Sequence, residues 1–262
     1  MIGTGRPSPQ GAMTVTILPD QSRVRNLLLQ TMSPSDFALL APHLVAVDMP
    51  AKKPLGEPDV KIATNWFFET AIASMVAMSP EGHQSESGFV GRCGFVDIAT
   101  LLGSNISSIE CYIQVAGTGF SIPASALQKA VAASSTLNQL LLRYVQAFIV
   151  QVAHTALSNA AHGVEERLAR WLLMCFDRVD GDEVALTHEF LSLMLNVRRS
   201  GVTMALASLS GAGLITTRRG FVALRDLAGL RDLASDSYGA PEEAYEKLIG
   251  ATLSRPSQFV RQ

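Results

Sequence analysis

The sequence predicts an α+β fold in which an N-terminal β-roll is followed by one long helix and a C-terminal winged helix-turn-helix. Three observations lead to this prediction. Between residues 44 and 122, short apolar runs alternate with turn residues, which is typical of strands. Between residues 125 and 159 there is neither glycine nor proline, and apolar residues recur every three or four positions. From residue 187 to 225 the order is helix, short turn, helix and β-hairpin.

The N-terminal part begins with a segment of low folding potential. Residues 1–20 are rich in glycine, proline and serine near their start, so we expect a disordered N-terminal segment. Two short helices are predicted at 21–31 and 34–42, because Ser33 provides an N-cap and Pro34 fits the first helical position. The β-roll domain that carries these helices is expected to extend over residues 21–123.

The long helix is predicted at residues 124–162. Its apolar stripe is too wide for one face of a β domain to cover, and a second copy of the helix would cover the rest. We therefore predict a homodimer. The alternative is a helix that packs only within its own chain. The predicted dimer-interface residues are Leu137, Leu141, Tyr144, Val145, Phe148 and Val152.

The most apolar stretch of the chain lies inside this helix, at residues 139–157. Arg143, Gln146, Gln151 and His154 interrupt it. A membrane span needs about 20 residues with few or no charges. We therefore interpret the stretch as part of a soluble helix and expect no membrane insertion.

The remaining part of the chain, residues 163–262, is assigned to the winged helix-turn-helix domain. Thr187 is expected to cap the first helix of the motif. Arg218, Arg219 and Gly220 form the predicted turn of the hairpin. The elements expected in this domain are helices at 164–179, 188–195, 198–212 and 237–250, and strands at 214–217 and 221–224.

Positive charge is concentrated in this domain, although the chain has a net charge of −2. Between Thr187 and Arg225 there are five arginines, no lysine and a single acidic residue, Glu189, so this segment carries +4 and the remainder −6. A basic module within an acidic protein is typical of binding to a phosphate backbone. We therefore predict double-stranded DNA as a partner.

The second helix of the motif begins at the first arginine pair. Arg199, Ser200 and Thr203 are predicted to lie on the face opposite the inward-facing Val202 and Leu206. The N-terminal residues of a recognition helix reach base edges in the major groove, where arginine can form two hydrogen bonds with guanine. The alternative is a solvated arginine pair at a helix start, which the second pair in the hairpin makes less favourable.

Residues 186–226 read LTHEFLSLMLNVRRSGVTMALASLSGAGLITTRRGFVALRD. This stretch resembles the DNA-binding domain of the Crp/Fnr superfamily of bacterial transcription regulators, in the branch with a VRR recognition helix and an RRG wing. The resemblance covers nearly the whole chain from about Val24, where the β region resembles the cyclic-nucleotide-binding-like effector roll and the long helix resembles the dimerisation helix. It implies a cytoplasmic homodimer that binds a palindromic operator, with RNA polymerase as a further contact.

Carried over by position, the resemblance also implies roles for single residues. Arg199 would be the leading base reader, and Arg198 would contact phosphate. The wing arginines would contact the DNA backbone or the adjacent minor groove. Met204 stands where some members have a polar base reader. The predicted DNA-binding residues are thus Thr187, Arg198, Arg199, Ser200, Thr203, Arg218 and Arg219.

The resemblance does not extend to a cyclic-nucleotide site. Members that bind cyclic nucleotides carry Gly-Glu followed by arginine and Ser/Thr, but in VDIATLLGSNISSIECYIQVAG the arginine position falls at Ser108 or a neighbour. Residues 93–128 contain no arginine or lysine, and a buried cyclic phosphate without a cationic partner is costly. We expect that cyclic AMP is not the effector. Another small-molecule effector and a ligand-independent regulator both remain open.

Other functional classes lack their motifs. The sequence has no GxSxG, HExxH, Walker loop or GxGxxG after a strand, so we do not expect an enzyme. Cys93, Cys111 and Cys175 fit no zinc motif and are too few for an iron–sulfur cluster, and we predict no metal or cofactor. A haem held by one histidine remains open, although none of the five histidines belongs to a motif. A winged-helix protein-interaction module is the rival interpretation, which an uncharged recognition helix and wing would favour.

Overall fold

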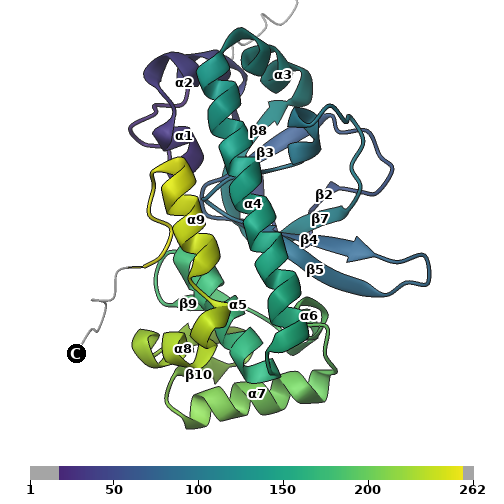
Figure 1. The fold of residues 1–262 in the computed structure, drawn as a ribbon, viewed down its shortest axis with the longest axis vertical. Coiled ribbons are helices and arrows are strands. Elements are labelled where there is room, and N and C mark those ends of the chain that lie inside the picture. Colours follow the sequence, from purple (N-terminus) through teal and green to yellow (C-terminus); the bar gives the residue numbers. More distant parts are fainter. Residues whose placement is uncertain (1–17, 256–262) are drawn as a thin grey trace, which may run out of the picture.

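The computed structural model describes residues 18–255 and has the predicted α+β architecture (Figure 1). A β-roll lies beside a long helix, and the C-terminal domain lies at one end of that helix. Most of the segment predicted as disordered, residues 1–20, lies outside the described residues. The helices α1 (Leu27–Thr31) and α2 (Pro34–Leu40) and the 3-10 turn η1 (Ala41–His43) precede the roll. Ser33 caps α2 as predicted, since its hydroxyl accepts a hydrogen bond from the Asp36 backbone N–H at 3.1 Å.

The roll consists of two four-stranded antiparallel sheets. One has the order β1 (Val45–Met49), β8 (Gly117–Pro123), β3 (Thr64–Phe68), β6 (Phe95–Val96). The other has the order β2 (Pro54–Gly56), β7 (Glu110–Val115), β4 (Ile72–Met78), β5 (Gln84–Val90), and the 3-10 turn η2 (Ile98–Leu101) follows β6. Aromatic side chains fill the interior: the rings of Phe67 and Phe95 stack at 5.0 Å, and the ring of Tyr144 lies 5.2 Å from Phe95.

The single helix predicted at residues 124–162 is two helices, α3 (Ala124–Ala133) and α4 (Ser135–Ala161). Ser134 separates them with an extended backbone (φ −133°, ψ 117°). Its hydroxyl accepts a hydrogen bond from the Leu137 backbone N–H at 3.2 Å and donates one to the Asp36 carboxylate at 2.5 Å. A serine offers the backbone such an alternative to helical hydrogen bonding. The contact with Asp36 also anchors α4 to α2.

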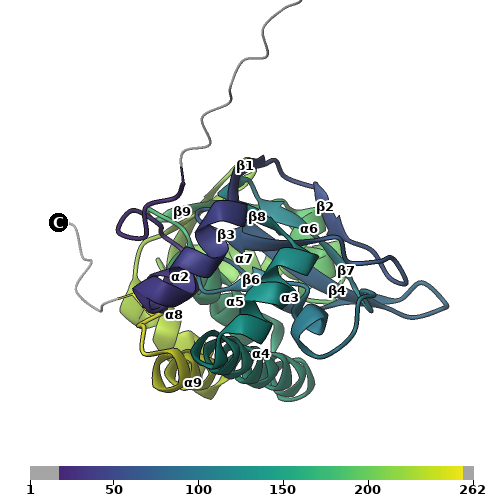
Figure 2. The ribbon, with the colours of Figure 1, turned by 90° about the horizontal axis from the view of Figure 1, so that it is seen from above.

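The inner face of α4 is covered by its own chain. The C-terminal helix α9 (Ala240–Ile249) lies along α4 (Figures 1 and 2), and Tyr245 of α9 belongs to the same core. The residues predicted for the dimer interface are covered within the protomer: Leu137, Leu141, Tyr144, Val145 and Phe148 are at most 9% exposed, and Val152 is partly buried. Because the same protomer buries five of these residues and part of Val152, the predicted choice of interface residues has to be corrected. Helix α4 has the predicted apolar stripe, but this stripe packs against other elements of the same protomer.

The same helix passes the length and composition criteria for a membrane span. Core helices of soluble proteins do so as well. Leu137 and Leu141 are completely buried in the core that the roll shares with α9. Packing inside the protomer thus accounts for part of the apolar character of α4, since 39% of the apolar window is buried.

The C-terminal domain contains the predicted helices and hairpin. Its elements are α5 (Val164–Arg178), β9 (Glu183–Ala185), α6 (His188–Met194), α7 (Arg199–Gly211), β10 (Ile215–Arg218), β11 (Phe221–Leu224), α8 (Leu227–Ala234) and the 3-10 turn η3 (Ser235–Ser237). Two elements were not predicted. Strand β9 pairs with β11 and widens the hairpin into a three-stranded sheet, and α8 follows that sheet. The helix predicted at 237–250 begins only after Gly239, whose positive φ of +113° is not helical.

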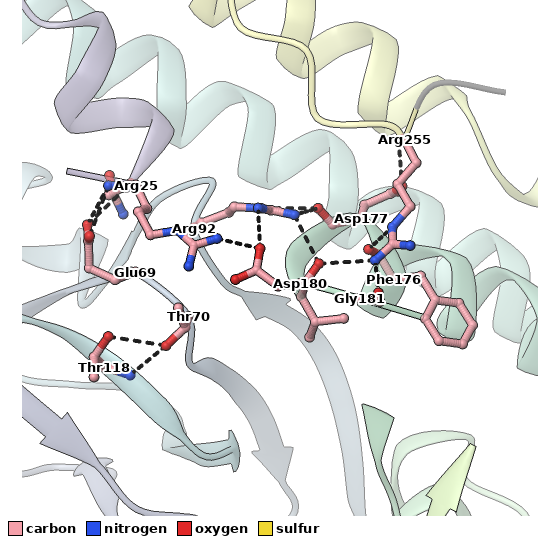
Figure 3. Close-up of polar contacts among 12 residues, drawn as sticks. Arg25, Glu69, Thr70, Arg92, Thr118, Phe176, Asp177, Asp180, Gly181 and Arg255 are labelled. Atoms are coloured by element: carbon pink, nitrogen blue, oxygen red, sulfur yellow. Dashed lines mark hydrogen bonds and ion pairs between the residues drawn. The ribbon is translucent and has the colours of Figure 1, made fainter. Parts of the chain in front are cut away.

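The loop that joins α5 to β9 is held by arginines from three other segments (Figure 3). Arg92 of the roll and Arg255 near the C-terminus both donate to the Val179 carbonyl oxygen, at 3.2 and 3.1 Å. Arg25, which precedes α1, forms an ion pair with Asp180, and Arg92 lies 3.4 Å from the same carboxylate. These contacts fasten the C-terminal domain to the roll at the start of its β-sheet.

Candidate nucleic-acid interface

The helix-turn-helix is built from local signals that fix both helices. The Thr187 hydroxyl caps α6 by accepting a hydrogen bond from the Phe190 backbone N–H at 3.1 Å, as predicted. Asn196 turns the chain with a φ of +48°, a conformation that asparagine tolerates better than most residues. Arg167 of α5 donates to the carbonyl of Leu195 just before this turn. The start of α7 is thereby held against α5.

Helix α7 buries one face and exposes the other. Val202, Ala205, Leu206 and Leu209 face the core of the domain. The exposed face carries Arg199, Ser200, Thr203, Met204 and Ala207. The division predicted from the spacing of Val202 and Leu206 is therefore present in the fold.

Thr203 has a structural role that its spacing does not indicate. Its hydroxyl donates to the Arg199 carbonyl oxygen at 3.1 Å and lies 3.0 Å from Nδ1 of His188 in α6. Because its proton is directed to the helix backbone, the hydroxyl is available to DNA mainly as an acceptor. His188 was not among the predicted site residues. Its contact with Thr203 links the first turn of α6 to the first turn of α7.

The two wing arginines differ in their partners. Arg218 forms two hydrogen bonds with the Glu183 carboxylate, at 2.8 and 2.6 Å, and its guanidinium lies 4.0 Å from the ring centroid of Phe221. The hydrogen bonds from Arg218 hold the pKa of Glu183 below its ordinary value. Arg219 is exposed and has no ion pair or hydrogen bond with any residue between 18 and 255. Of the pair, Arg219 is thus the more accessible cation.

A groove of about 670 Å³ runs between the helix-turn-helix and the wing. Thr187, His188, Arg199, Arg218 and Arg219 line it, so residues from α6, α7 and the hairpin meet at one place. Arg198 does not join them. It borders a separate cleft between α6 and the roll, beside Lys52 and Glu110. The first arginine pair is therefore divided between two surfaces.

The groove has the donors that recognition of an anionic polymer requires. Arg199 has no ion pair or hydrogen bond from its side chain to another described residue, so its guanidinium is free to bind an external acceptor. Ser200 offers a hydroxyl next to it. Guanidinium groups form paired hydrogen bonds with phosphate oxygens or with guanine.

Comparison with known proteins agrees with this geometry. Residues 166–233 match the model of the Crp-like helix-turn-helix domain. No protein with a curated description matches the sequence. Among solved structures, FixK2 from Bradyrhizobium japonicum is similar with a TM-score of 0.62 and 16% identity, over 73% of this chain and 98% of that one. A Crp/Fnr-family transcriptional regulator from Eubacterium rectale reaches a TM-score of 0.61 with 15% identity, over 79% and 97% of the two chains.

A third structure supports the same fold. A CRP-family transcriptional regulator from Thermus thermophilus matches with a TM-score of 0.58 and 19% identity, over 79% of this chain and 98% of that one. At these identities the structures establish the fold, and the match at residues 166–233 establishes the domain. The Eubacterium rectale and Thermus thermophilus proteins are described as transcriptional regulators. The chain therefore has the fold of these Crp/Fnr-family structures and contains a Crp-like helix-turn-helix domain at residues 166–233.

Proposed function

We propose that the protein is a cytoplasmic, sequence-specific transcription regulator that binds a palindromic DNA site as a homodimer. The observation that carries this proposal is the groove in which Arg199 of α7 and Arg219 of the wing both lie without an internal partner among the described residues. A recognition helix and a wing that present arginines to the same space suit one duplex, with α7 in the major groove. Contact with RNA polymerase is a further expectation from the family.

The residues in and around the groove are proposed to make different contacts with DNA. Arg199 and Ser200, at the start of α7, read base edges. Arg219 binds the DNA backbone or the adjacent minor groove, and Arg218 joins it by exchanging Glu183 for phosphate. An exposed ion pair such as Arg218–Glu183 contributes little stability, so little free energy is lost when Arg218 leaves Glu183 for a phosphate. Thr187 and Thr203 support the two helix starts and accept hydrogen bonds from DNA, and Arg198 contacts a phosphate beyond the groove.

The homodimer is proposed to form through the outer face of α4. Its exposed residues Leu142, Gln146, Ile149, Ala153, Ala156 and Ala160 follow one another at alternating steps of four and three, the spacing of a coiled-coil seam. Leu142 and Ile149 are 40% and 51% exposed in the protomer. Arg143 is the only arginine, lysine or acidic residue of α4, so charge does not oppose the approach of a second copy. This seam replaces the six predicted interface residues.

The roll is proposed not to take cyclic AMP as its effector. Asp97 begins η2 within the segment that corresponds to the phosphate cassette, and its side chain is buried. Burial raises the pKa of Asp97 to about 6, while a hydrogen bond from Ser107 acts in the opposite direction. A buried carboxylate repels a cyclic phosphate instead of neutralising it. A different small-molecule effector, or regulation without a ligand, fits the roll better.

Loss of Arg199 is expected to relax sequence preference. Arg199→Ala should weaken binding to a site selected from random DNA by about 1–3 kcal/mol and leave binding to unrelated DNA nearly unchanged. Electrophoretic mobility shifts with both duplexes measure this difference. Arg23→Ala, which removes an exposed arginine before α1, is the matched control. Equal affinity of Arg199→Ala and the unmodified protein for the selected site would rule out base reading by Arg199.

Loss of Arg219 is expected to act on every sequence alike. Arg219→Ala should reduce affinity for selected and unrelated DNA by the same factor and lower the slope of log affinity against log salt by about one per protomer, because one phosphate contact is lost. Fluorescence anisotropy at several salt concentrations measures the slope. A protein-interaction module, the rival function, predicts no salt-dependent DNA binding at all.

A further inference from the structure

The most exposed large hydrophobic side chain among residues 18–255 is Met204, which is 72% exposed and lies on the outer face of α7. Its exposed neighbours on the helix are Ser200, Ala207 and Ser208. All three are shorter, so the thioether of Met204 projects beyond them. The chain therefore keeps a long apolar group on the exposed side of α7, the helix that is proposed to enter the major groove.

The chemistry of the major groove offers one apolar partner for such a group. Thymine carries a C5 methyl there, whereas the other groups on the base edges are hydrogen-bond donors and acceptors. Methionine is unbranched and flexible, so it adapts to an apolar contact of irregular shape. Because α7 rises about 1.5 Å per residue, Met204 lies about 7.5 Å along the helix from Arg199, so the two side chains can reach different bases.

Resting on the proposed function, we propose that Met204 is a specificity-determining residue that contacts the C5 methyl group of one thymine in each half-site. Arg199 and Met204 would then select different features of the same half-site, one by hydrogen bonds and the other by apolar contact. Sequence position alone suggests only the absence of a polar reader. The exposure of Met204 adds a positive role, because internal packing does not account for this side chain.

The test uses the full-length protein and a duplex that the unmodified protein selects from random DNA. Each thymine in turn is replaced by deoxyuridine, which removes the methyl group and leaves the hydrogen-bonding edge intact. One such replacement should weaken binding by about fourfold per half-site, as expected for loss of one buried methyl group. Met204→Ala should bind the unmodified duplex about fourfold more weakly per half-site and should be insensitive to that same replacement.

Two control variants separate this effect from others. Met78→Ala removes an exposed methionine from β4 of the roll and should retain the full response to deoxyuridine. Arg199→Ala should also retain it, although its affinity is lower. Thermal unfolding of Met204→Ala checks that the exposed substitution leaves the domain folded.

The outcomes distinguish the two proposals. If the protein selects a DNA site but no thymine replacement changes its affinity, the proposed role of Met204 is wrong and the DNA-binding function is unaffected. The same conclusion follows if Met204→Ala responds to deoxyuridine as strongly as the unmodified protein. If the unmodified protein selects no DNA sequence, the proposed function fails, and the inference that rests on it fails too.

Discussion

Between pH 5 and pH 7, the unfolding free energy of the unmodified protein is expected to fall by about 2 kcal/mol more than that of Glu86→Gln. Glu86 lies on β5 and is 4% exposed. Its carboxyl group accepts hydrogen bonds from the Ser74 hydroxyl at 2.8 Å and from the Trp171 indole at 2.9 Å. Burial nevertheless dominates and raises the pKa of Glu86 from 4.5 to about 7, against the lowering effect of these bonds and of Arg170 and Arg178.

The unfolding free energy falls with rising pH because the folded chain holds the Glu86 proton more tightly than the unfolded chain does. Below pH 4.5, Glu86 is protonated in both the folded and the unfolded chain, and its contribution to stability is fully present. As the pH rises towards 7, the unfolded chain releases this proton while the folded chain retains it, so the contribution is lost. Glutamine has no such proton and still accepts a hydrogen bond from Trp171.

Urea unfolding at pH 5, 6, 7 and 8 measures the difference. Glu57→Gln, at an exposed glutamate of the roll, is the matched control and should follow the unmodified protein. Other buried carboxyl groups with a raised pKa, such as Asp97 and Asp177, are common to all three proteins and cancel in the comparison. Parallel curves for Glu86→Gln and the unmodified protein would contradict the expectation.

Glu86 and its hydrogen-bond partners lie at the boundary between the roll and the C-terminal domain. Ser74, its partner on β4, lies 3.5 Å from the sulfur of Met194 in α6, and Trp171 belongs to α5. Residues of the outer face of the roll, among them Phe89, share one core with both helices. A carboxyl group that titrates near neutrality therefore sits where the roll meets the helix-turn-helix.

Local patterns were sufficient to predict the helix-turn-helix. Thr187 caps α6, Val202 and Leu206 face inward, and Gly220 adopts the positive φ of +79° that the hairpin turn requires. Each of these features depends on residues within a few positions of one another. For this reason the sequence alone was enough to predict that the first residues of α7 are exposed.

Contacts between distant segments could not be predicted in this way. Glu183, the partner of Arg218, lies 35 residues before it in a strand too short to stand out from the sequence. Helix periodicity shows that α4 has an apolar face, but it does not show what covers that face. Here the cover includes α9, which follows α4 by nearly 80 residues. For this physical reason, the predicted dimer surface was placed on residues that the protomer itself buries.

A matched pair of substitutions at neighbouring positions on α4 is expected to separate folding from dimer formation. Phe148→Asp should unfold the protomer, because Phe148 is buried in the core beside Gly88 of β5. Loss of a core phenylalanine costs about 3–5 kcal/mol, and an unpaired buried charge adds to that cost. This sum is comparable to the whole stability of a typical domain. Circular dichroism should show loss of helix for this variant.

Ile149→Asp should have the opposite profile, since Ile149 is half exposed and lies at the centre of the proposed seam. The variant should remain folded in circular dichroism but become monomeric in light scattering, because two aspartates would face each other across the seam. Val45→Asp, at an exposed position of β1, controls for the added charge and should stay dimeric. A palindromic duplex should lose most of its affinity for Ile149→Asp, since two linked domains bind with a high effective concentration and separate domains do not. A folded, dimeric Ile149→Asp would place the dimer interface elsewhere on the molecule.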